Sequence, residues 1–140
     1  MSERGHLGET LAGRYLVRRG WNILARNWSG AGGELDIVAL RAGLVAFVEV
    51  KTRTDASALG DPIRYGQRRR MINAARLFVA RRPDLAAASV RFDVIAIDMS
   101  RRWFRVDHIA GAFEMDASVD TPPAPNNTRS GYATDRNDRR

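Results

Sequence analysis

The chain has 140 residues, of which 44% are hydrophobic, a net charge of +7 and no cysteine. Disulfide bonds and thiolate metal sites are therefore excluded, and the two histidines argue against a histidine-rich zinc site. No apolar run approaches the ~18–20 residues of a membrane helix, and the N-terminal segment lacks an apolar signal sequence. We therefore expect a cytoplasmic protein with no membrane partner. The basic charge favours nucleic acid as the partner.

Hydrophobic periodicity and breaker residues divide the chain into seven elements. Gly20 ends the first predicted helix, and Pro83 follows the second. The order α-β-β-β-α-β-β predicts an α/β fold in which helices flank a mixed sheet. The predicted helices are 4–19 and 64–82, and the predicted strands are 21–28, 34–41, 44–53, 90–98 and 103–109.

Two further expectations concern the ends of the chain and its core. We expect one domain over residues 1–115, followed by a disordered polar tail over 116–140, which holds few large apolar residues. Asp93, at the start of an apolar strand, is expected to support the fold through a buried hydrogen bond rather than to take part in catalysis. The tryptophans are expected to lie in the core rather than to stack on bases; they are Trp21, Trp28 and Trp103.

The most informative segment is the predicted hairpin formed by 34–41 and 44–53 around Ala42-Gly43. If the two strands close on a two-residue turn, Asp36 falls directly opposite Glu49. Ala-Gly is not a strong signal for such a turn, and a different loop would shift the register. The alignment of the two carboxylates is therefore a hypothesis about the fold.

Two opposed carboxylates repel each other unless a cation lies between them. Mg²⁺ binds through one or two carboxylates together with water and substrate phosphate, and the backbone carbonyl of Val50 could supply a further oxygen. Lys51 follows Glu49 by two residues on the same strand face and is the only lysine in the chain. An amine beside a metal-bound water can orient or deprotonate that water. Asp36, Glu49 and Lys51 therefore predict a divalent-metal nuclease site.

The simpler alternative is a surface hairpin with alternating charges. In the same register Glu34 falls opposite Lys51, and the two would form an ordinary cross-strand ion pair. The coincidence of Asp36, a glycine-rich approach and the single lysine favours the metal site over this alternative.

Four ordered motifs lead from this pattern to a family. Together they resemble the PD-(D/E)XK nuclease core and, within it, the YraN-like bacterial family of predicted endonucleases, distantly related to archaeal Holliday-junction resolvases. One departure is that Leu35, and not proline, precedes Asp36. The motifs are GETLAGRYL at 8–16, GWNILARN at 20–27, GELDIVA at 33–39 and FVEVKTR at 47–53.

The resemblance implies a restriction-endonuclease-like core with a central mixed five-stranded sheet in a nuclease-like domain over 1–115. It implies an endodeoxyribonuclease dependent on Mg²⁺ or Mn²⁺ that cuts DNA, including branched or Holliday-junction-like structures. Asp36 and Glu49 match the metal-binding carboxylates, Lys51 the catalytic lysine, and Glu9 a further acidic position. The resemblance also allows a homodimer.

Residues of the second predicted helix complete the expected site. Gln67 shares an apolar stripe with Met71, and it resembles the glutamine that several such enzymes carry after the core hairpin; it could bind a metal-bound water or a phosphate. Arginine suits phosphate because its donors are paired. The arginines expected to bind nucleic acid are Arg53, Arg64, Arg68, Arg69 and Arg70.

Two functions remain open. The first is the metal-dependent endonuclease, with DNA favoured over RNA as its substrate. The second is a non-catalytic nucleic-acid-binding or interaction module on a nuclease-like scaffold. The sequence alone does not separate a DNA nuclease from an RNA nuclease.

Overall fold

The computed structural model describes residues 3–53, 65–100 and 102–115. The order of its elements is the predicted order, with a short 3-10 helix added before β4. Arg64 and the tail over 116–140 lie outside the described residues. The elements are α1 (Glu3–Arg18), β1 (Asn22–Gly30), β2 (Gly33–Arg41), β3 (Leu44–Arg53), α2 (Tyr65–Ala80), η2 (Pro83–Leu85), β4 (Ser89–Asp98) and β5 (Arg105–Phe113).

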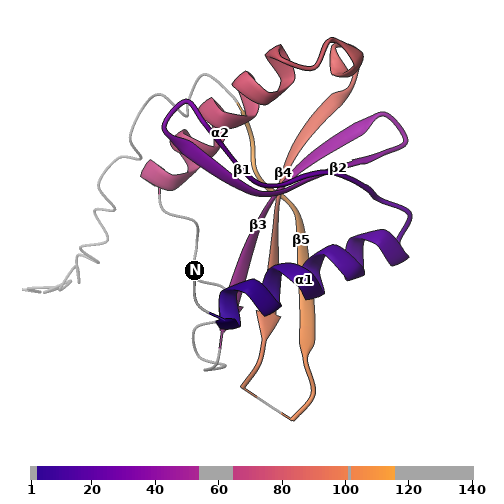
Figure 1. Ribbon diagram of the computed structural model, residues 1–140, viewed down its shortest axis with the longest axis vertical. Coiled ribbons are helices and arrows are strands. Elements are labelled where there is room, and N and C mark those ends of the chain that lie inside the picture. Colours follow the sequence, from indigo (N-terminus) through magenta and orange to yellow (C-terminus); the bar gives the residue numbers. More distant parts are fainter. Residues whose placement is uncertain (1–2, 54–64, 101, 116–140) are drawn as a thin grey trace, which may run out of the picture.

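The five strands form one sheet in the order β1-β2-β3-β4-β5. Neighbouring strands are antiparallel except β3 and β4, which are parallel. A parallel pair needs a crossover connection, and α2 lies within it. The helices lie on opposite faces of the sheet, α1 on one and α2 on the other (Figure 1). The predicted mixed α/β architecture is confirmed.

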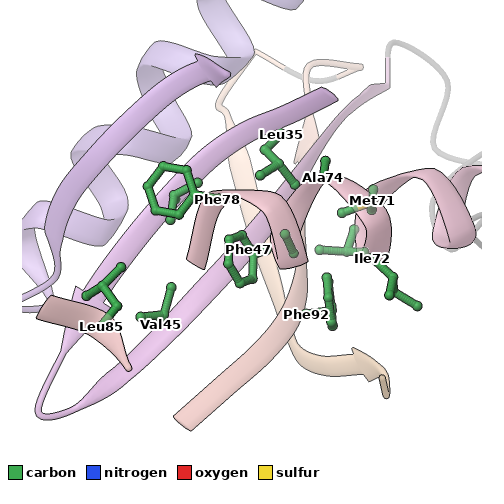
Figure 2. Packing of buried hydrophobic residues seen from close by; sticks show 12 residues of the cluster. Leu35, Val45, Phe47, Met71, Ile72, Ala74, Phe78, Leu85 and Phe92 are labelled. Carbon is green, nitrogen blue, oxygen red and sulfur yellow. The ribbon is translucent and has the colours of Figure 1, made fainter. Parts of the chain in front are cut away.

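Each face of the sheet carries its own hydrophobic core. Under α2, Phe47 of β3 packs edge-on against Phe78 and stacks on Phe92 of β4. Figure 2 shows this core between α2 and the sheet. The core under α1 is formed by Ala12, Leu16, Trp21, Ile37, Ala39, Ala46, Val48, Ile95 and Ile97.

The β2–β3 hairpin closes as predicted. Ala42 and Gly43 both adopt positive φ, 48° and 74°, which is the geometry of a two-residue type I′ turn. Arg41 pairs with Leu44, and the register continues unbroken to the pair Ile37–Val48. The turn thus sets the alignment that brings Asp36 and Glu49 to the same level of the two strands.

Beyond that pair, β2 and β3 separate. β2 continues beside β1 as far as Gly33, whereas β3 continues beside β4 as far as Arg53. The two strands therefore form a fork. Asp36 and Glu49 are the first residues beyond the last β2–β3 pair on its two branches.

The alternation of side chains along β2 is inverted at the fork. Leu35 and Val38 both pack into the core under α2, while Ile37 packs under α1. In β1, Asn27 has a φ of 48°, in the left-handed region that L-residues seldom adopt. It lies at the same level as Asp36, between the flanking pairs of the β1–β2 ladder. The side-chain pattern and the φ of Asn27 together show that the β1–β2 pair is irregular at the level of Asp36.

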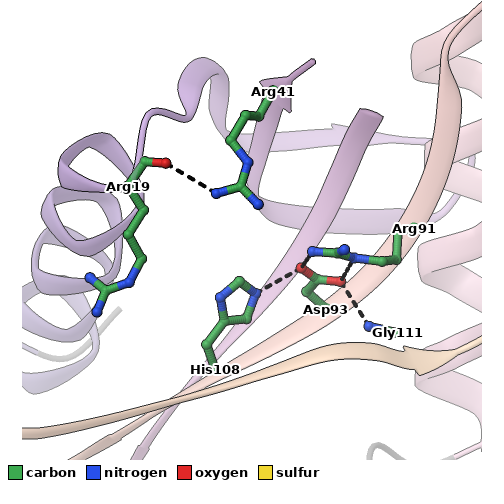
Figure 3. Close-up of polar contacts among 6 residues, drawn as sticks. All are labelled: Arg19, Arg41, Arg91, Asp93, His108 and Gly111. Carbon is green, nitrogen blue, oxygen red and sulfur yellow. Dashed lines mark hydrogen bonds and ion pairs between the residues drawn. The ribbon is translucent and has the colours of Figure 1, made fainter. Parts of the chain in front are cut away.

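Asp93 supports the fold, as predicted. Its fully buried carboxylate accepts two hydrogen bonds from Arg91 at 2.8 and 2.9 Å, one from the backbone N–H of Gly111 at 3.0 Å, and lies 2.7 Å from Nε2 of His108 (Figure 3). Burial alone would raise the pKa of Asp93, but these hydrogen bonds lower it to about 2. The network fastens the irregular part of β5 to β4.

The tryptophan prediction is right for two residues and wrong for the third. Trp21 is buried and Trp28 is partly buried against the core under α2. Trp103 is 79% exposed, and it lies in the connection between β4 and β5. Within the part of the chain that the structure describes, no helix has the length and apolar character needed to span a membrane.

Candidate active site

The fork opens into a pocket of about 340 Å³ between the β1–β2 turn, the two separated strands and α2. Its walls are mostly polar, and they include both carboxylates that the sequence predicts to be metal ligands. The lining residues are Gly32, Gly33, Glu34, Asp36, Glu49, Gln67, Arg70 and Met71.

Beyond the last β2–β3 pair, the carboxylate of Asp36 serves as the hydrogen-bond acceptor for a backbone N–H of β3. Its Oδ2 accepts a hydrogen bond of 2.8 Å from the N–H of Val50, a donor on the opposite branch. Burial and then the negative charge of Glu49 raise the pKa of Asp36 to about 7, and the hydrogen bond from Val50 lowers it by less. The two predicted carboxylates therefore lie close enough to interact strongly.

Glu49, Lys51 and Gln67 form a connected triangle. Gln67 Nε2 of α2 donates a hydrogen bond of 2.7 Å to Glu49 Oε1, and Lys51 Nζ donates one of 3.4 Å to Gln67 Oε1. Lys51 Nζ also lies 3.6 Å from Glu49 Oε1. The exposed fractions are 23% for the lysine side chain and 12% for that of Glu49. The amine is thus held at the site while part of it stays open to solvent.

The alternative prediction, an ion pair between Glu34 and Lys51, is wrong. The ladder that would have opposed them ends before Asp36, and Lys51 interacts with Glu49 instead. Glu34 is exposed and lines the pocket, where its charge acts on Asp36.

Glu9 approaches the fork from α1. Burial raises its pKa, a hydrogen bond from the side chain of Asn27 lowers it, and the charge of Asp36 raises it. The preceding residue, Gly8, fixes this approach, because a Cβ at its position would overlap the hydroxyl of Thr52 in β3. Glu9 is therefore a third acid near the fork, on a different element from the other two.

The donor set suits a hard divalent cation that keeps several waters. Among the described residues, no group of three or more His, Cys, Asp and Glu side chains is gathered closely enough to enclose a metal ion. Two carboxylates at an open polar pocket are the set through which Mg²⁺ usually binds, since water and substrate phosphate supply the remaining ligands. Asp36 and Glu49 provide that pair, and their mutual repulsion would be relieved by a cation.

The predicted phosphate-binding arginines lie in different places. Arg70 lines the pocket, and Arg69 is exposed on α2. Arg68 lies over the ring of Phe113, with its guanidinium carbon 5.6 Å from the ring centre, and so it faces the opposite side of the helix. Of the predicted arginines that the structure describes, Arg70 is the one that lines the pocket.

Arg53 and Arg64 complete the predicted set. Arg53, at the end of β3, donates a hydrogen bond of 3.2 Å to the carbonyl of Thr52 and is partly buried. Arg64 lies outside the described residues. Arg53 lies two residues after Lys51, at the end of the same strand.

Two residues of the site escaped the sequence reasoning. Gly33 lies against α2, and a Cβ there would overlap the backbone carbonyl of Arg70. It thus lets the β1–β2 turn approach the helix and close the pocket. The sequence feature that could have indicated this role is the position of Gly33 at the start of the segment that carries Asp36. Asn27, which contacts Glu9, gave no signal beyond the tolerance of asparagine for positive φ.

The chain is similar to known proteins over most of its length. Residues 8–97, which include all the residues of the triangle, Asp36 and Glu9, match the model of the family described as "Uncharacterised protein family UPF0102". The chain belongs to the UPF0102 family. The predicted YraN-like family membership is thereby confirmed.

Relatives in this family cover most of the chain. A UPF0102 protein of Synechococcus sp. (strain JA-3-3Ab) is 38% identical, over 82% of this chain and 92% of its own length. A UPF0102 protein of Myxococcus xanthus is 42% identical, over 80% of this chain and 90% of its own. A third, from Paramagnetospirillum magneticum, is 42% identical over 81% of this chain and 88% of its own. The similarity therefore extends over most of this chain and most of each relative.

Proposed function

We propose that this UPF0102 chain is a metal-dependent endonuclease that hydrolyses phosphodiester bonds in DNA. The observation that carries the proposal is the fork, where Asp36 and Glu49 line one pocket and Lys51 is held beside Glu49 by Gln67. An acid pair, an amine and a basic protein body are what such a reaction requires. Branched DNA enters the proposal only through the family resemblance.

Asp36 and Glu49 are the residues that would hold Mg²⁺ or Mn²⁺, with Glu9 supporting Asp36 from α1. A divalent cation bound there supplies an activated water and neutralises charge on the scissile phosphate. The hydrogen bond from Val50 to Asp36 and the one from Gln67 to Glu49 fix the directions of the two carboxylates. In this proposal Val50 thus acts through its N–H.

Lys51 serves the proton and charge requirements of the reaction. Its Nζ lies next to Glu49, where it can orient the attacking water and hold positive charge near the phosphate as negative charge develops. Gln67 restrains both Lys51 and Glu49, so the amine does not need to be positioned during the reaction. Arg70, on the pocket wall, would donate hydrogen bonds to a phosphate oxygen.

The proposal is tested with purified protein on branched, single-stranded and linear duplex DNA in Mg²⁺ or Mn²⁺. We expect cleavage that is lost in Asp36→Asn, Glu49→Gln and Lys51→Ala, while DNA binding persists. Asp84→Asn and Arg81→Ala are matched controls, since both residues are exposed and lie on or next to η2. Cleavage that survives in Asp36→Asn and Glu49→Gln would refute the assignment.

One observation favours the second candidate, a nucleic-acid-binding module without turnover. It is that, among the described residues, no group of three or more His, Cys, Asp and Glu side chains is gathered closely enough to enclose a metal ion. Calorimetry with Mn²⁺ separates the two functions. Binding heat that disappears in Asp36→Asn supports the enzyme, whereas salt-sensitive DNA binding without any Mn²⁺ heat supports the module.

A further inference from the structure

The β4–β5 connection carries two adjacent aromatic side chains that the fold does not cover. Trp103 is 79% exposed and Phe104 is 54% exposed. Figure 1 shows this hairpin extending past the rest of the sheet, at the lower end of the view. Aromatic side chains on soluble proteins are mostly buried, so two in succession at a protruding tip indicate a contact with another molecule.

The tip, formed by Arg102, Trp103, Phe104 and Arg105, lies at the end of the sheet that carries the candidate active site. β4 runs parallel to β3, so that Ala96 lies beside Lys51 and Asp98 beside Arg53. Both strands therefore end at the same end of the sheet. The chain leaves β4 for the tip shortly beyond the level of Lys51. From the strand rise and the strand spacing, Phe104 lies roughly 14 Å from Lys51.

The base of the tip is fixed in position. The N–H of Met99 donates a hydrogen bond of 2.7 Å to the carbonyl of Arg53. The buried carboxylate of Asp98 accepts one of 2.8 Å from the N–H of Ser100. Met99 and Ser100, at the start of the connection that leads to Trp103, are therefore tied to β3 and to β4.

The neighbours of the two aromatic residues decide between kinds of partner. Arg102 is exposed, and the side chain of Arg105 is 66% exposed, with Asp107 at 3.4 Å as its ion-pair partner. A surface for another protein usually places apolar side chains around its aromatic residues. An aromatic pair between arginines is instead suited to unpaired nucleic acid, because bases stack on the rings and phosphates bind the guanidinium groups.

We propose that the tip formed by Arg102, Trp103, Phe104 and Arg105 binds unpaired DNA bases next to the duplex that enters the active site. Trp103 and Phe104 stack on the bases, while the arginines bind the adjacent phosphates. The inference rests on the proposed nuclease function and adds a preference to it: duplex DNA that carries an unpaired flank. With a base step of about 3.4 Å, the estimated distance corresponds to a cut a few nucleotides from the point where pairing ends.

The binding test uses the full chain without divalent metal, so that DNA is not cut. Fluorescence anisotropy compares a blunt duplex with the same duplex carrying a single-stranded flank. In Trp103→Ala and in Phe104→Ala, we expect affinity for the flanked duplex to fall about tenfold, with little change for the blunt duplex. Val17→Ala is the control, because Val17 is a 55% exposed apolar residue on α1.

Tryptophan emission gives a second readout. All three tryptophans lie within the described residues, and Trp103 is the one that is more than half exposed, whereas Trp21 is 3% exposed. A single-stranded DNA oligonucleotide should therefore quench the long-wavelength part of the emission in the parent protein and not in Trp103→Phe. An oligonucleotide that leaves the emission unchanged overturns the inference.

Other outcomes also overturn it. One is an equal loss of affinity, or no loss, for both duplexes in the two alanine variants. Another is tighter binding when the flank is RNA, which would assign the tip to RNA. A third is a dimer in light scattering that becomes a monomer in the double variant Trp103→Ala/Phe104→Ala, which would assign the tip to a second copy of the chain.

Failure of this inference is distinguishable from failure of the proposed function. Flank-dependent binding through the tip without any Lys51-dependent cleavage would refute the enzyme and leave the tip assignment standing. Lys51-dependent cleavage that does not change on substitution of Trp103 and Phe104 would refute the tip assignment and leave the enzyme standing.

Discussion

The side-chain amide of Gln67 donates a hydrogen bond of 2.7 Å to the carboxylate of Glu49. This contact joins α2 to β3 across 18 residues of sequence, and the carbonyl of the same amide accepts from Lys51. One neutral side chain thus orients an acid and a base at once. Neither a carboxylate nor an ammonium group could serve at this position, since of these three groups only an amide offers a hydrogen-bond donor and an acceptor together.

Loss of this amide should weaken metal binding and leave the fold intact. We expect Gln67→Ala to reduce Mn²⁺ affinity by about 10- to 100-fold, the usual effect of removing a group that orients a metal ligand. Calorimetry with Mn²⁺ measures it. Asn73→Ala removes an amide from the same helix away from the pocket and should change nothing. Equal affinity in both variants would contradict the role given to Gln67.

The single lysine should not tolerate replacement by arginine. Lys51→Arg keeps the charge, but a planar guanidinium cannot occupy the compact position beside Glu49 and Gln67. We expect the rate of DNA cleavage to fall by about 10²- to 10⁴-fold, as for loss of a positioned acid or base. DNA binding should change less than about threefold. Arg81→Lys, on an exposed residue, is the control, and full activity in Lys51→Arg would exclude proton transfer by Lys51.

The raised pKa of Asp36 predicts a pH-dependent stability. Without metal, the folded state holds this proton up to about pH 7, whereas the unfolded chain releases it near pH 4. The stabilising contribution is therefore complete below pH 4 and is lost as the pH rises to about 7. Asp36→Asn should then exceed the parent by ~2 kcal/mol in unfolding free energy at pH 8, and by nothing at pH 4.

Urea denaturation in a chelator checks this difference. Adding Mn²⁺ at pH 8 should reverse it, because a cation stabilises the ionised parent and not the variant. Asp84→Asn is the matched control: the pKa of Asp84 is lowered by Arg82, so it shows no gain at high pH. A pH-independent difference for Asp36→Asn would mean that Asp36 does not lie in the repulsive surroundings described.

Gly33 should be intolerant of any side chain. Gly33→Ala places a Cβ, which is fixed rigidly to the backbone of β2, against the backbone carbonyl of Arg70, so that α2 must shift. We expect a loss of about 1–3 kcal/mol in unfolding free energy together with weaker Mn²⁺ binding, because the helix carries Gln67. Gly66→Ala, in the first turn of α2, would place its Cβ in ordinary van der Waals contact with Arg70 Nη1 at 3.6 Å, and it should be neutral or stabilising. Urea denaturation of both variants decides.

The Asp93 network should behave in the opposite way to Asp36. Its pKa is about 2 in the folded state, so its stabilising contribution is present above about pH 4 and is lost as the pH falls toward 2. Asp93→Asn should lower the unfolding free energy by ~2 kcal/mol at pH 7, with a smaller loss at pH 3. DNA binding should be unaffected. A loss of equal size at both pH values would contradict the lowered pKa.

The sequence predicted those parts of the site that depend on local geometry. The turn at Ala42-Gly43 fixes the register of the hairpin over a few residues, and this alone aligns Asp36 with Glu49. Helical spacing likewise placed Gln67 on the inner side of α2. Both rules act over short distances along the chain, so they can be applied without knowing the rest of the fold.

The remaining features depend on competition between distant segments. The fork exists because β1 and β4 hold the two branches after the pair Ile37–Val48, and no local pattern encodes that. The exposure of Trp103 depends on where α1 and α2 end over the sheet. An aromatic residue in a short strand pattern is compatible with a core position and with an uncovered tip, so its environment could not be read from its neighbours.

A chain with one lysine, held at the pocket with 23% of its side chain exposed, offers a chemical handle of unusual selectivity. Reductive methylation with ¹³C-formaldehyde would attach labels to this amine and to the terminal α-amino group alone. The resulting pair of NMR signals would follow the protonation of Nζ during titrations with cations or oligonucleotides. The bias toward arginine elsewhere thus turns a candidate catalytic group into its own spectroscopic reporter.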